Sequence, residues 1–122
     1  QDAFAVQPAA DAEHGGTYGH IFVVADGMGG HAVGEKASAK AVRDIPLTYT
    51  KHVPHEGAAG AIRRAFVEAN RAIHQIGQSN PEFKGLGTTG TALFLRPEGA
   101  WVGHVGDSRC YRVRGDHVQQ LT

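Results

Sequence analysis

The stretch Ile21–His31, IFVVADGMGGH, constrains the fold more than any other part of the chain. Its first four residues favour a buried β-strand, which runs into Asp26 and then into a run of glycines. Because glycine leaves the backbone bare, the pattern places a carboxylate at a sheet edge beside open carbonyl and amide groups. A lone Asp-Gly pair would more simply cap the next helix, but the whole run favours a site for Mg²⁺ or Mn²⁺, which prefer oxygen ligands.

Composition excludes several classes of partner. The 122 residues suit one domain, and 12 basic residues balance 12 acidic ones, which gives no electrostatic reason to bind nucleic acid or an anionic membrane. No apolar run approaches the length that spans a bilayer. Cys110 is the single cysteine, which rules out an internal disulfide and fits a reducing compartment. We therefore expect a soluble cytoplasmic protein.

Two helices are predicted from hydrophobic spacing. The first covers residues 31–44, and Pro46 is expected to end it because proline lacks the helical N–H donor. Residues 47–55 are predicted to be irregular. The second covers residues 56–78, where apolar side chains recur at steps of three and one along a single stripe.

The remaining chain is predicted to consist of strands and loops. Residues 8–16 are rich in Pro, Gly, Asp and Glu and indicate a surface turn, and residues 81–90 indicate a loop. Helices that follow one another between hairpin-linked strands favour an α+β fold with antiparallel sheet. The predicted strands are Gln1–Gln7, Thr17–Ala25, Thr91–Leu95, Ala100–Gly106, Cys110–Val113 and His117–Leu121.

Acidic residues stand at the ends of three predicted strands. Asp26 precedes a glycine, Asp107 follows one, and Asp2 opens the first strand, which we expect to pair with the strand that carries Asp26. Three carboxylates at one end of a sheet would repel one another unless a divalent cation or protons offset their charge. A bound Mg²⁺ or Mn²⁺ also lowers the pKa of its water, and such a cluster therefore favours phosphoester hydrolysis.

Other catalytic arrangements fit less well. Neither Ser38 nor Ser108 lies in a G-x-S-x-G elbow, and the eight histidines and Cys110 show no zinc-ligand spacing. His104, flanked by Gly and Val in a strand, is interpreted as a packed histidine. His31 opens a helix beside the glycines and is a candidate for lining the site.

Four segments together resemble a known family. Asp26–Ser38 reads DGMGGHAVGEKAS, Gly87–Ala92 reads GTTGTA, Gly103–Arg109 reads GHVGDSR, and Gln1–Phe4 reads QDAF. These motifs, in this order, resemble those of bacterial metal-dependent protein phosphatases of type 2C. The match extends across nearly the whole chain.

The resemblance implies a β-sandwich of antiparallel sheets with flanking helices, and two Mg²⁺ or Mn²⁺ ions at one end. A metal-activated water would hydrolyse a phosphorylated substrate, either a phosphoprotein or a small phosphoester. By motif, Asp26 would bridge the metals, the Gly27 carbonyl would bind one of them, and Asp2 would hold metal-bound water. Asp107 would serve a third, weaker metal site. His31 is a candidate catalytic residue.

The resemblance covers the N-terminal half of the family's catalytic domain. Family members have an arginine shortly before the segment that matches Gln1–Phe4 and two later aspartates that complete the metal core. Many of them also have glutamate where Gln1 stands, and Leu121 and Thr122 fall about where an L-T-x-D-H segment begins. We therefore expect residues 1–122 to form a truncated phosphatase domain with weakened activity, or alternatively an impaired pseudophosphatase or fragment that acts as a dimerising interaction module.

A homodimer is expected whether the chain is a weakened phosphatase or an interaction module. A half-domain would leave open strand edges and an apolar face uncovered, and a second copy could cover them. The expected face lies around Phe22, Val24, Leu93, Phe94 and Trp101.

Overall fold

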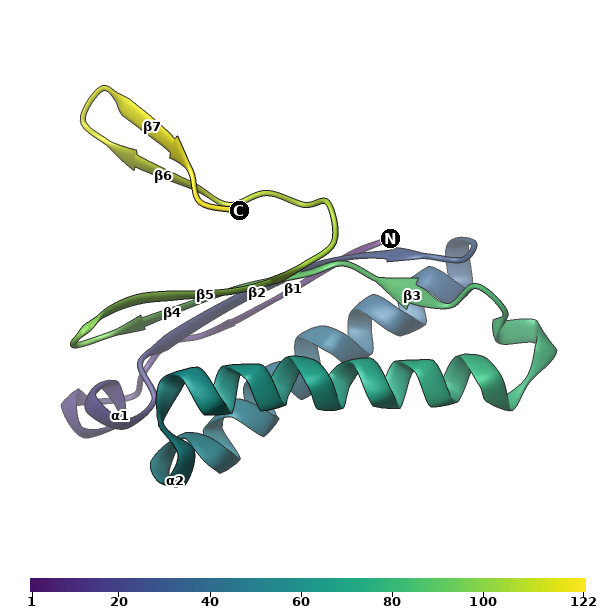
Figure 1. Ribbon diagram of the computed structural model, residues 1–122, viewed down its shortest axis with the longest axis horizontal. Coiled ribbons are helices and arrows are strands. Elements are labelled where there is room, and N and C mark those ends of the chain that lie inside the picture. Colours follow the sequence, from purple (N-terminus) through teal and green to yellow (C-terminus); the bar gives the residue numbers. More distant parts are fainter.

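The computed structural model describes residues 1–122, apart from the side chain of His31. Its helices and strands build an α+β fold with antiparallel sheets, and this fold class is confirmed (Figure 1). The elements are β1 (Asp2–Gln7), α1 (Ala12–Thr17), β2 (His20–Met28), α2 (His31–Ser79), the 3₁₀ helix η1 (Pro81–Phe83), β3 (Gly87–Thr88), β4 (Gly90–Arg96), β5 (Gly99–Val105), β6 (Tyr111–Arg114) and β7 (His117–Gln120).

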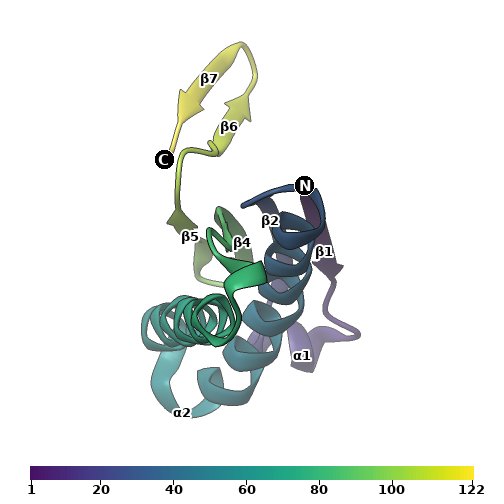
Figure 2. The same cartoon turned by 90° about the vertical axis from the view of Figure 1, so that its right-hand side faces the viewer.

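The main sheet has the strand order β1-β2-β4-β5, and the short β3 pairs with the end of β2. All of its pairings are antiparallel. Strands β6 and β7 form a separate two-stranded sheet that extends away from the main sheet (Figures 1 and 2). Every residue of both hairpin strands is exposed, so the hairpin is an arm rather than part of the core.

Helix α2 covers one face of the main sheet as two arms (Figures 1 and 2). The chain turns between the arms at Gly57, whose φ of 76° is open to glycine but costly for other residues. The prediction that Pro46 ends the first helix was wrong, because residues 47–55 are helical. Tyr49 and Val53 continue the four-residue spacing of the earlier apolar side chains and are buried, at 0% and 4% exposure. Their burial offsets the cost of proline in the helix.

Three smaller elements also differ from the predictions. The predicted turn at residues 8–16 contains the start of α1, where the Asp11 side chain caps the helix by accepting a hydrogen bond from the His14 N–H at 2.8 Å. Strand β2 consequently begins at His20 rather than at Thr17. The predicted loop at residues 81–90 contains η1 and β3, which are too short to produce a periodic sequence signal.

The core lies between the sheet and α2. Tyr49 packs on Phe94 with ring centroids 4.5 Å apart, and its hydroxyl donates to the Tyr18 carbonyl at 2.6 Å. The second arm approaches β5 closely because Gly103 has no side chain: a Cβ there would lie 2.5 Å from the Phe66 ring. The buried apolar side chains of the sheet are Ile21, Val23, Ala25, Ala92 and Phe94.

The sheet's other face is open. Phe4, Val6 and Val24 are 75%, 56% and 52% exposed there. The predicted apolar face was partly wrong, since Phe94 is fully buried under α2 and Trp101, its register partner, also lies on the covered side. Strand alternation explains the error, because neighbouring positions point to opposite faces.

The sheet end farthest from Asp26 is fastened by Arg96. Its Nη1 donates to the Thr17 carbonyl and to the Tyr49 hydroxyl, both at 2.7 Å, and its Nε donates to Glu98 at 2.6 Å. One cation thereby joins the end of α1, the middle of α2 and the β4–β5 turn.

Candidate metal centre

The strand order brings the predicted acidic residues to one end of the sheet. Asp2 of β1 is the register partner of Asp26 of β2, so both side chains lie on the same, open face. Strand β4 begins at this end, with Gly90 opposite Val105, and Asp107 follows the end of β5 there. Asp107 is exposed in the turn after β5.

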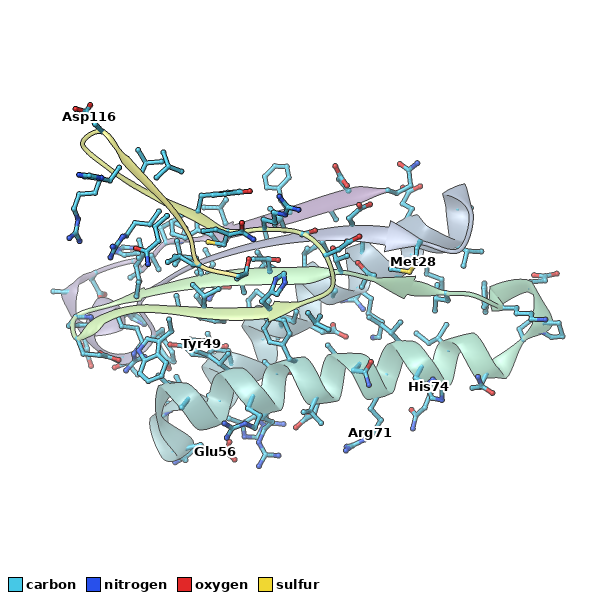
Figure 3. The ribbon with its side chains drawn as sticks, turned by 45° about the horizontal axis from the view of Figure 1, so that its top comes forward. Met28, Tyr49, Glu56, Arg71, His74 and Asp116 are labelled. Atoms are coloured by element: carbon cyan, nitrogen blue, oxygen red, sulfur yellow. The ribbon has the colours of Figure 1, made fainter. Side chains whose placement is uncertain are left out.

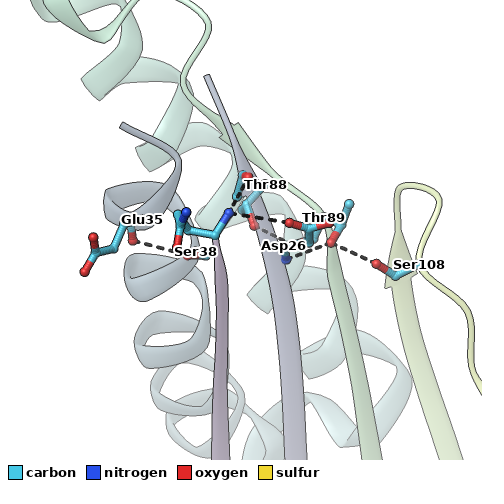
Figure 4. Close-up of polar contacts among 8 residues, drawn as sticks. Asp26, Glu35, Ser38, Thr88, Thr89 and Ser108 are labelled. Atoms are coloured by element: carbon cyan, nitrogen blue, oxygen red, sulfur yellow. Dashed lines mark hydrogen bonds and ion pairs between the residues drawn. The ribbon is translucent and has the colours of Figure 1, made fainter. Parts of the chain in front are cut away.

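The backbone of Asp26 is clamped by Thr89. The Asp26 N–H donates to the Thr89 hydroxyl at 2.9 Å, and the Thr89 N–H donates to the Asp26 carbonyl at 2.9 Å (Figure 4). Thr89 is 3% exposed, whereas the Asp26 side chain is 60% exposed. The clamp fixes the backbone at the end of β2 and leaves the carboxylate accessible. Sequence reasoning did not single out Thr89, although it lies within the GTTGTA motif.

Gly27 is held on two sides. Its N–H donates to the Gln1 carbonyl at 2.7 Å, and its carbonyl accepts from the Gln1 nitrogen at 2.9 Å. A Cβ at Gly27 would lie 1.9 Å from the carbonyl oxygen of Gly34 in α2, so no side chain fits. The glycine therefore lets the start of α2 pack directly on the end of β2.

The turn that carries Asp107 is attached to the same clamp. Gly106 has a φ of 104° and packs on Thr89, whose Cγ2 would lie 2.7 Å from an added Cβ. The Ser108 hydroxyl lies 3.1 Å from the Thr89 hydroxyl (Figure 4). Thr89 thus contacts both residues that flank Asp107 and also the backbone of Asp26.

The donors at this end are of the right kind for a hard divalent cation. Asp2 and Asp26 offer carboxylates, and the Gly27 carbonyl retains a second lone pair beyond its hydrogen bond. Mg²⁺ is commonly bound through one or two carboxylates and keeps several waters, and this set fits that pattern. Among the side chains that the structure describes, no group of three Asp, Glu, His or Cys residues is close enough to hold an ion. The catalytic prediction for His31 falls on a side chain outside the described part.

A groove of about 860 Å³ lies elsewhere, between β5 and the arms of α2. It is lined mainly by apolar side chains, including Ile62, Phe66 and Trp101, and by none of the three predicted acidic residues. Figure 3 shows Arg71 and His74 along the second arm, and Glu56 next to the turn at Gly57. No carboxylate side chain lines the groove, so we place the candidate metal site at the sheet end.

Comparison with known proteins identifies the family. The family model described as Protein phosphatase 2C matches residues 1–122, the whole chain. The chain belongs to the protein phosphatase 2C family. It is 35% identical over 106 residues to "Protein phosphatase PhpP" of Streptococcus pneumoniae serotype 2, covering 84% of this chain and 42% of that protein. It is 35% identical over 105 residues to "Serine/threonine phosphatase stp" of Listeria innocua, with the same coverage.

Solved structures agree with this assignment. The serine/threonine phosphatase Stp1 from Staphylococcus aureus superposes with a TM-score of 0.81 at 26% identity, covering 99% of this chain and 46% of that one. The catalytic domain of serine threonine protein phosphatase PstP, solved in complex with two manganese ions, superposes with a TM-score of 0.75 at 28% identity, covering 100% and 54%. The chain spans about half the length of the curated relatives it matches.

In the part of the chain that the structure describes, no helix combines the length and the apolar character needed to cross a bilayer.

Proposed function

We propose that this type 2C domain hydrolyses phosphate monoesters with the help of Mn²⁺ or Mg²⁺, acting on a phosphoprotein or a small phosphoester. The observation that carries the proposal is the register pairing of Asp2 with Asp26 on the open face, beside the Gly27 carbonyl. Family membership over residues 1–122 supports the same chemistry. The serine/threonine phosphatases among the relatives support a phosphoserine or phosphothreonine substrate.

In this proposal, Asp26 and the Gly27 carbonyl would hold the Mn²⁺ or Mg²⁺ ions, and Asp2 would accept a hydrogen bond from water at the same end of the sheet. When bound, the ion supplies a Lewis acid that lowers the pKa of a coordinated water and offsets phosphate charge. Asp107 would serve a third, weaker metal position. The Thr89 clamp supports these roles, since it fixes the Asp26 backbone while the carboxylate stays 60% exposed.

The proposal is tested by hydrolysis of p-nitrophenyl phosphate during a Mn²⁺ titration. Asp26→Asn should lower the metal-dependent rate on the order of a hundredfold or more, because ion binding and water activation fail together. Asp116→Asn is the matched control, since Asp116 lies at the exposed tip of the β6–β7 hairpin (Figure 3). Full activity in excess chelator, or an Asp26→Asn variant as active as the control, would contradict the metal mechanism.

We also propose that the domain forms a homodimer, in which it could act as an interaction module. Support comes from the open apolar sheet face and from the hairpin arm, where Val113 and Val118 are 69% and 67% exposed. Large exposed apolar surfaces commonly mark contact sites. Val24→Asp on the open face should weaken dimerisation at least tenfold, whereas Val67→Asp on α2, where the side chain is 48% exposed, should not. A compact monomer at micromolar concentration in sedimentation would contradict the dimer.

We propose a cytoplasmic location and no nucleic-acid partner. The lone Cys110 and the formal net charge of zero support these two proposals.

A further inference from the structure

His104 bridges the sheet and the turn that carries Asp107. It lies in β5 directly opposite Thr91 of β4. Its Nδ1 is 2.9 Å from the Thr91 hydroxyl, and its Nε2 is 3.0 Å from the carbonyl oxygen of Gly106. Both ring nitrogens therefore have a partner, which differs from the interpretation of His104 as a merely packed side chain.

The Gly106 carbonyl decides which nitrogen carries the proton. A carbonyl oxygen only accepts hydrogen bonds, so Nε2 must donate. In the neutral ring, Nδ1 then carries the lone pair and accepts from the Thr91 hydroxyl. Thr91 is 7% exposed, and its hydroxyl consequently orients the ring from a nearly buried position.

The carbonyl that His104 holds belongs to the peptide group that links Gly106 to Asp107. Because a peptide group is planar, fixing its oxygen also fixes the direction of the Asp107 N–H and the position of the Asp107 α-carbon. Gly106 has a φ of 104° and, as a glycine, would otherwise move freely. On the far side of Asp107, the Ser108 hydroxyl contacts Thr89 at 3.1 Å. The Asp107 backbone is thus held from both sides.

We propose that His104 is a positioning residue, which sets the orientation of Asp107 toward the Asp26 end of the sheet through the hydrogen bond from its Nε2 to the Gly106 carbonyl. The expected consequence is a higher affinity of the Asp107 position for a divalent cation. This consequence rests on the proposed function. The contact between His104 Nε2 and the Gly106 carbonyl can be tested without metal.

Two variants separate a hydrogen-bonding role from a packing role. Gln places its amide nitrogen near the position of Nε2 and can still donate to the Gly106 carbonyl, whereas the shorter Asn places its nitrogen near Nδ1 and cannot reach it. His104→Asn should therefore release the turn, and His104→Gln should retain it. His20→Asn is the matched control, because His20 lies on the same face of the sheet at its opposite end and bonds the Ala9 N–H at 3.0 Å.

The first measurement is ¹⁵N relaxation of the metal-free protein. The order parameter of the Asp107 amide should be near the rigid value of about 0.85 in the parent and in His104→Gln, and should fall below about 0.6 in His104→Asn. His20→Asn should leave it unchanged. Equal order parameters in the Asn variant, the Gln variant and the parent would overturn the proposal, and so would equal losses in the Asn and Gln variants.

The second measurement is the Mn²⁺ concentration that gives half-maximal hydrolysis. It should rise roughly three- to tenfold in His104→Asn and stay within about twofold in His104→Gln, while kcat at saturating Mn²⁺ stays within about twofold in both. In an Asp107→Asn background, His104→Asn should add no further change, because the two residues act as a unit. Additive effects would overturn the assigned role. Loss of all Mn²⁺ dependence in the parent would instead defeat the proposed function, and the relaxation measurement would still decide the contact.

Discussion

The two faces of the main sheet share the same strands and differ in almost everything else. On the covered face, Val23 is 1% exposed and Phe94 is fully buried under α2. On the open face, Val24 and Phe4 are 52% and 75% exposed, and Asp2 and Asp26 lie at the end of the same face. Adjacent residues of β2 therefore serve different purposes: one row stabilises the fold and the other presents the candidate site.

The comparison indicates how mutational effects should divide. Burying an aliphatic or aromatic side chain is worth about 1.5–3 kcal/mol, so changes on the covered face act mainly on the free energy of unfolding. Changes on the open face remove little buried surface and should act mainly on metal binding or association. Substitutions on each face test that division.

The same truncation on the two faces should differ severalfold in cost. Phe94→Ala should lower the free energy of unfolding by about 3–5 kcal/mol, because it leaves a cavity beneath Tyr49. Phe4→Ala should cost less than about 1 kcal/mol, since that ring is 75% exposed. Urea unfolding measures both. Similar losses at the two positions would show that the open face is covered in solution.

Two of the acidic residues at the site, Asp26 and Asp107, should also differ. At saturating Mn²⁺, Asp26→Asn should reduce hydrolysis on the order of a hundredfold, and Asp107→Asn should reduce it less, because Asp107 is proposed to serve the weaker position. The Asp107→Asn effect should grow as Mn²⁺ is lowered. Steady-state rates over a Mn²⁺ series measure this. Equal losses at saturating metal would assign Asp107 to the primary position.

Gly27 is where the two faces meet, because its backbone belongs to the site and its unsubstituted α-carbon packs against α2. Gly27→Ala should cost about 1–3 kcal/mol in unfolding free energy and should also weaken Mn²⁺ binding, since the new Cβ would displace the Gly34 carbonyl. Gly16→Ala is the control, because nothing lies within 4 Å of a Cβ there. Urea unfolding and Mn²⁺ titration should be run on both. A Gly27→Ala variant with unchanged stability would contradict the close packing.

The smallest predicted effect is a dependence of stability on pH in α2. Burial alone would raise the pKa of Asp44, but hydrogen bonds from Lys40 at 2.8 Å and Arg43 at 3.1 Å lower it below the ordinary 3.8. A lowered folded-state pKa contributes stability above the unfolded pKa, and that stability is lost as pH falls through the folded pKa. Asp44→Asn should cost about 1 kcal/mol at pH 7, and this cost should shrink as pH falls through the folded pKa.

Urea unfolding across this pH range measures the difference between Asp44→Asn and the parent. The control is Asp116→Asn on the exposed hairpin tip, which should match the parent at every pH. A constant difference between Asp44→Asn and the parent from pH 2 to pH 7 would exclude the ion pairs as its cause.

Much of the fold could be predicted because runs of strand-forming apolar residues end at glycines and turn residues. Ile21, Val23 and Ala25 are buried while their neighbours are not, and the antiparallel order follows from hairpin-linked strands. The length of α2 could not be predicted from Pro46 alone, since burial of Tyr49 and Val53 outweighs the local cost of proline. Their four-residue spacing was the signal that could have revealed it.

For the candidate site, the sequence predicted which residues end each strand but not which residues contact one another across strands. Pairing of the strand that begins with Asp2 and the strand that carries Asp26 was expected, and the register places these two residues opposite each other. Thr89 and the partners of His104 could not be predicted, because they depend on which residues face each other across β2, β4 and β5. Register of this kind is set by packing over the whole sheet rather than by local sequence.

The turn of α2 at Gly57 has a consequence for how the chain folds. Strands β2 and β4 are neighbours in the sheet, yet the 49-residue α2 separates them in sequence. Bringing distant segments together costs chain entropy and slows folding. A helical hairpin that doubles back at Gly57 returns the chain to its starting end before β4 begins, so local helix formation shortens the effective loop. We expect the two arms to dock early in folding, before β2 pairs with β4. A lengthened hinge at Gly57 should therefore lower the refolding rate more than it changes the unfolding rate.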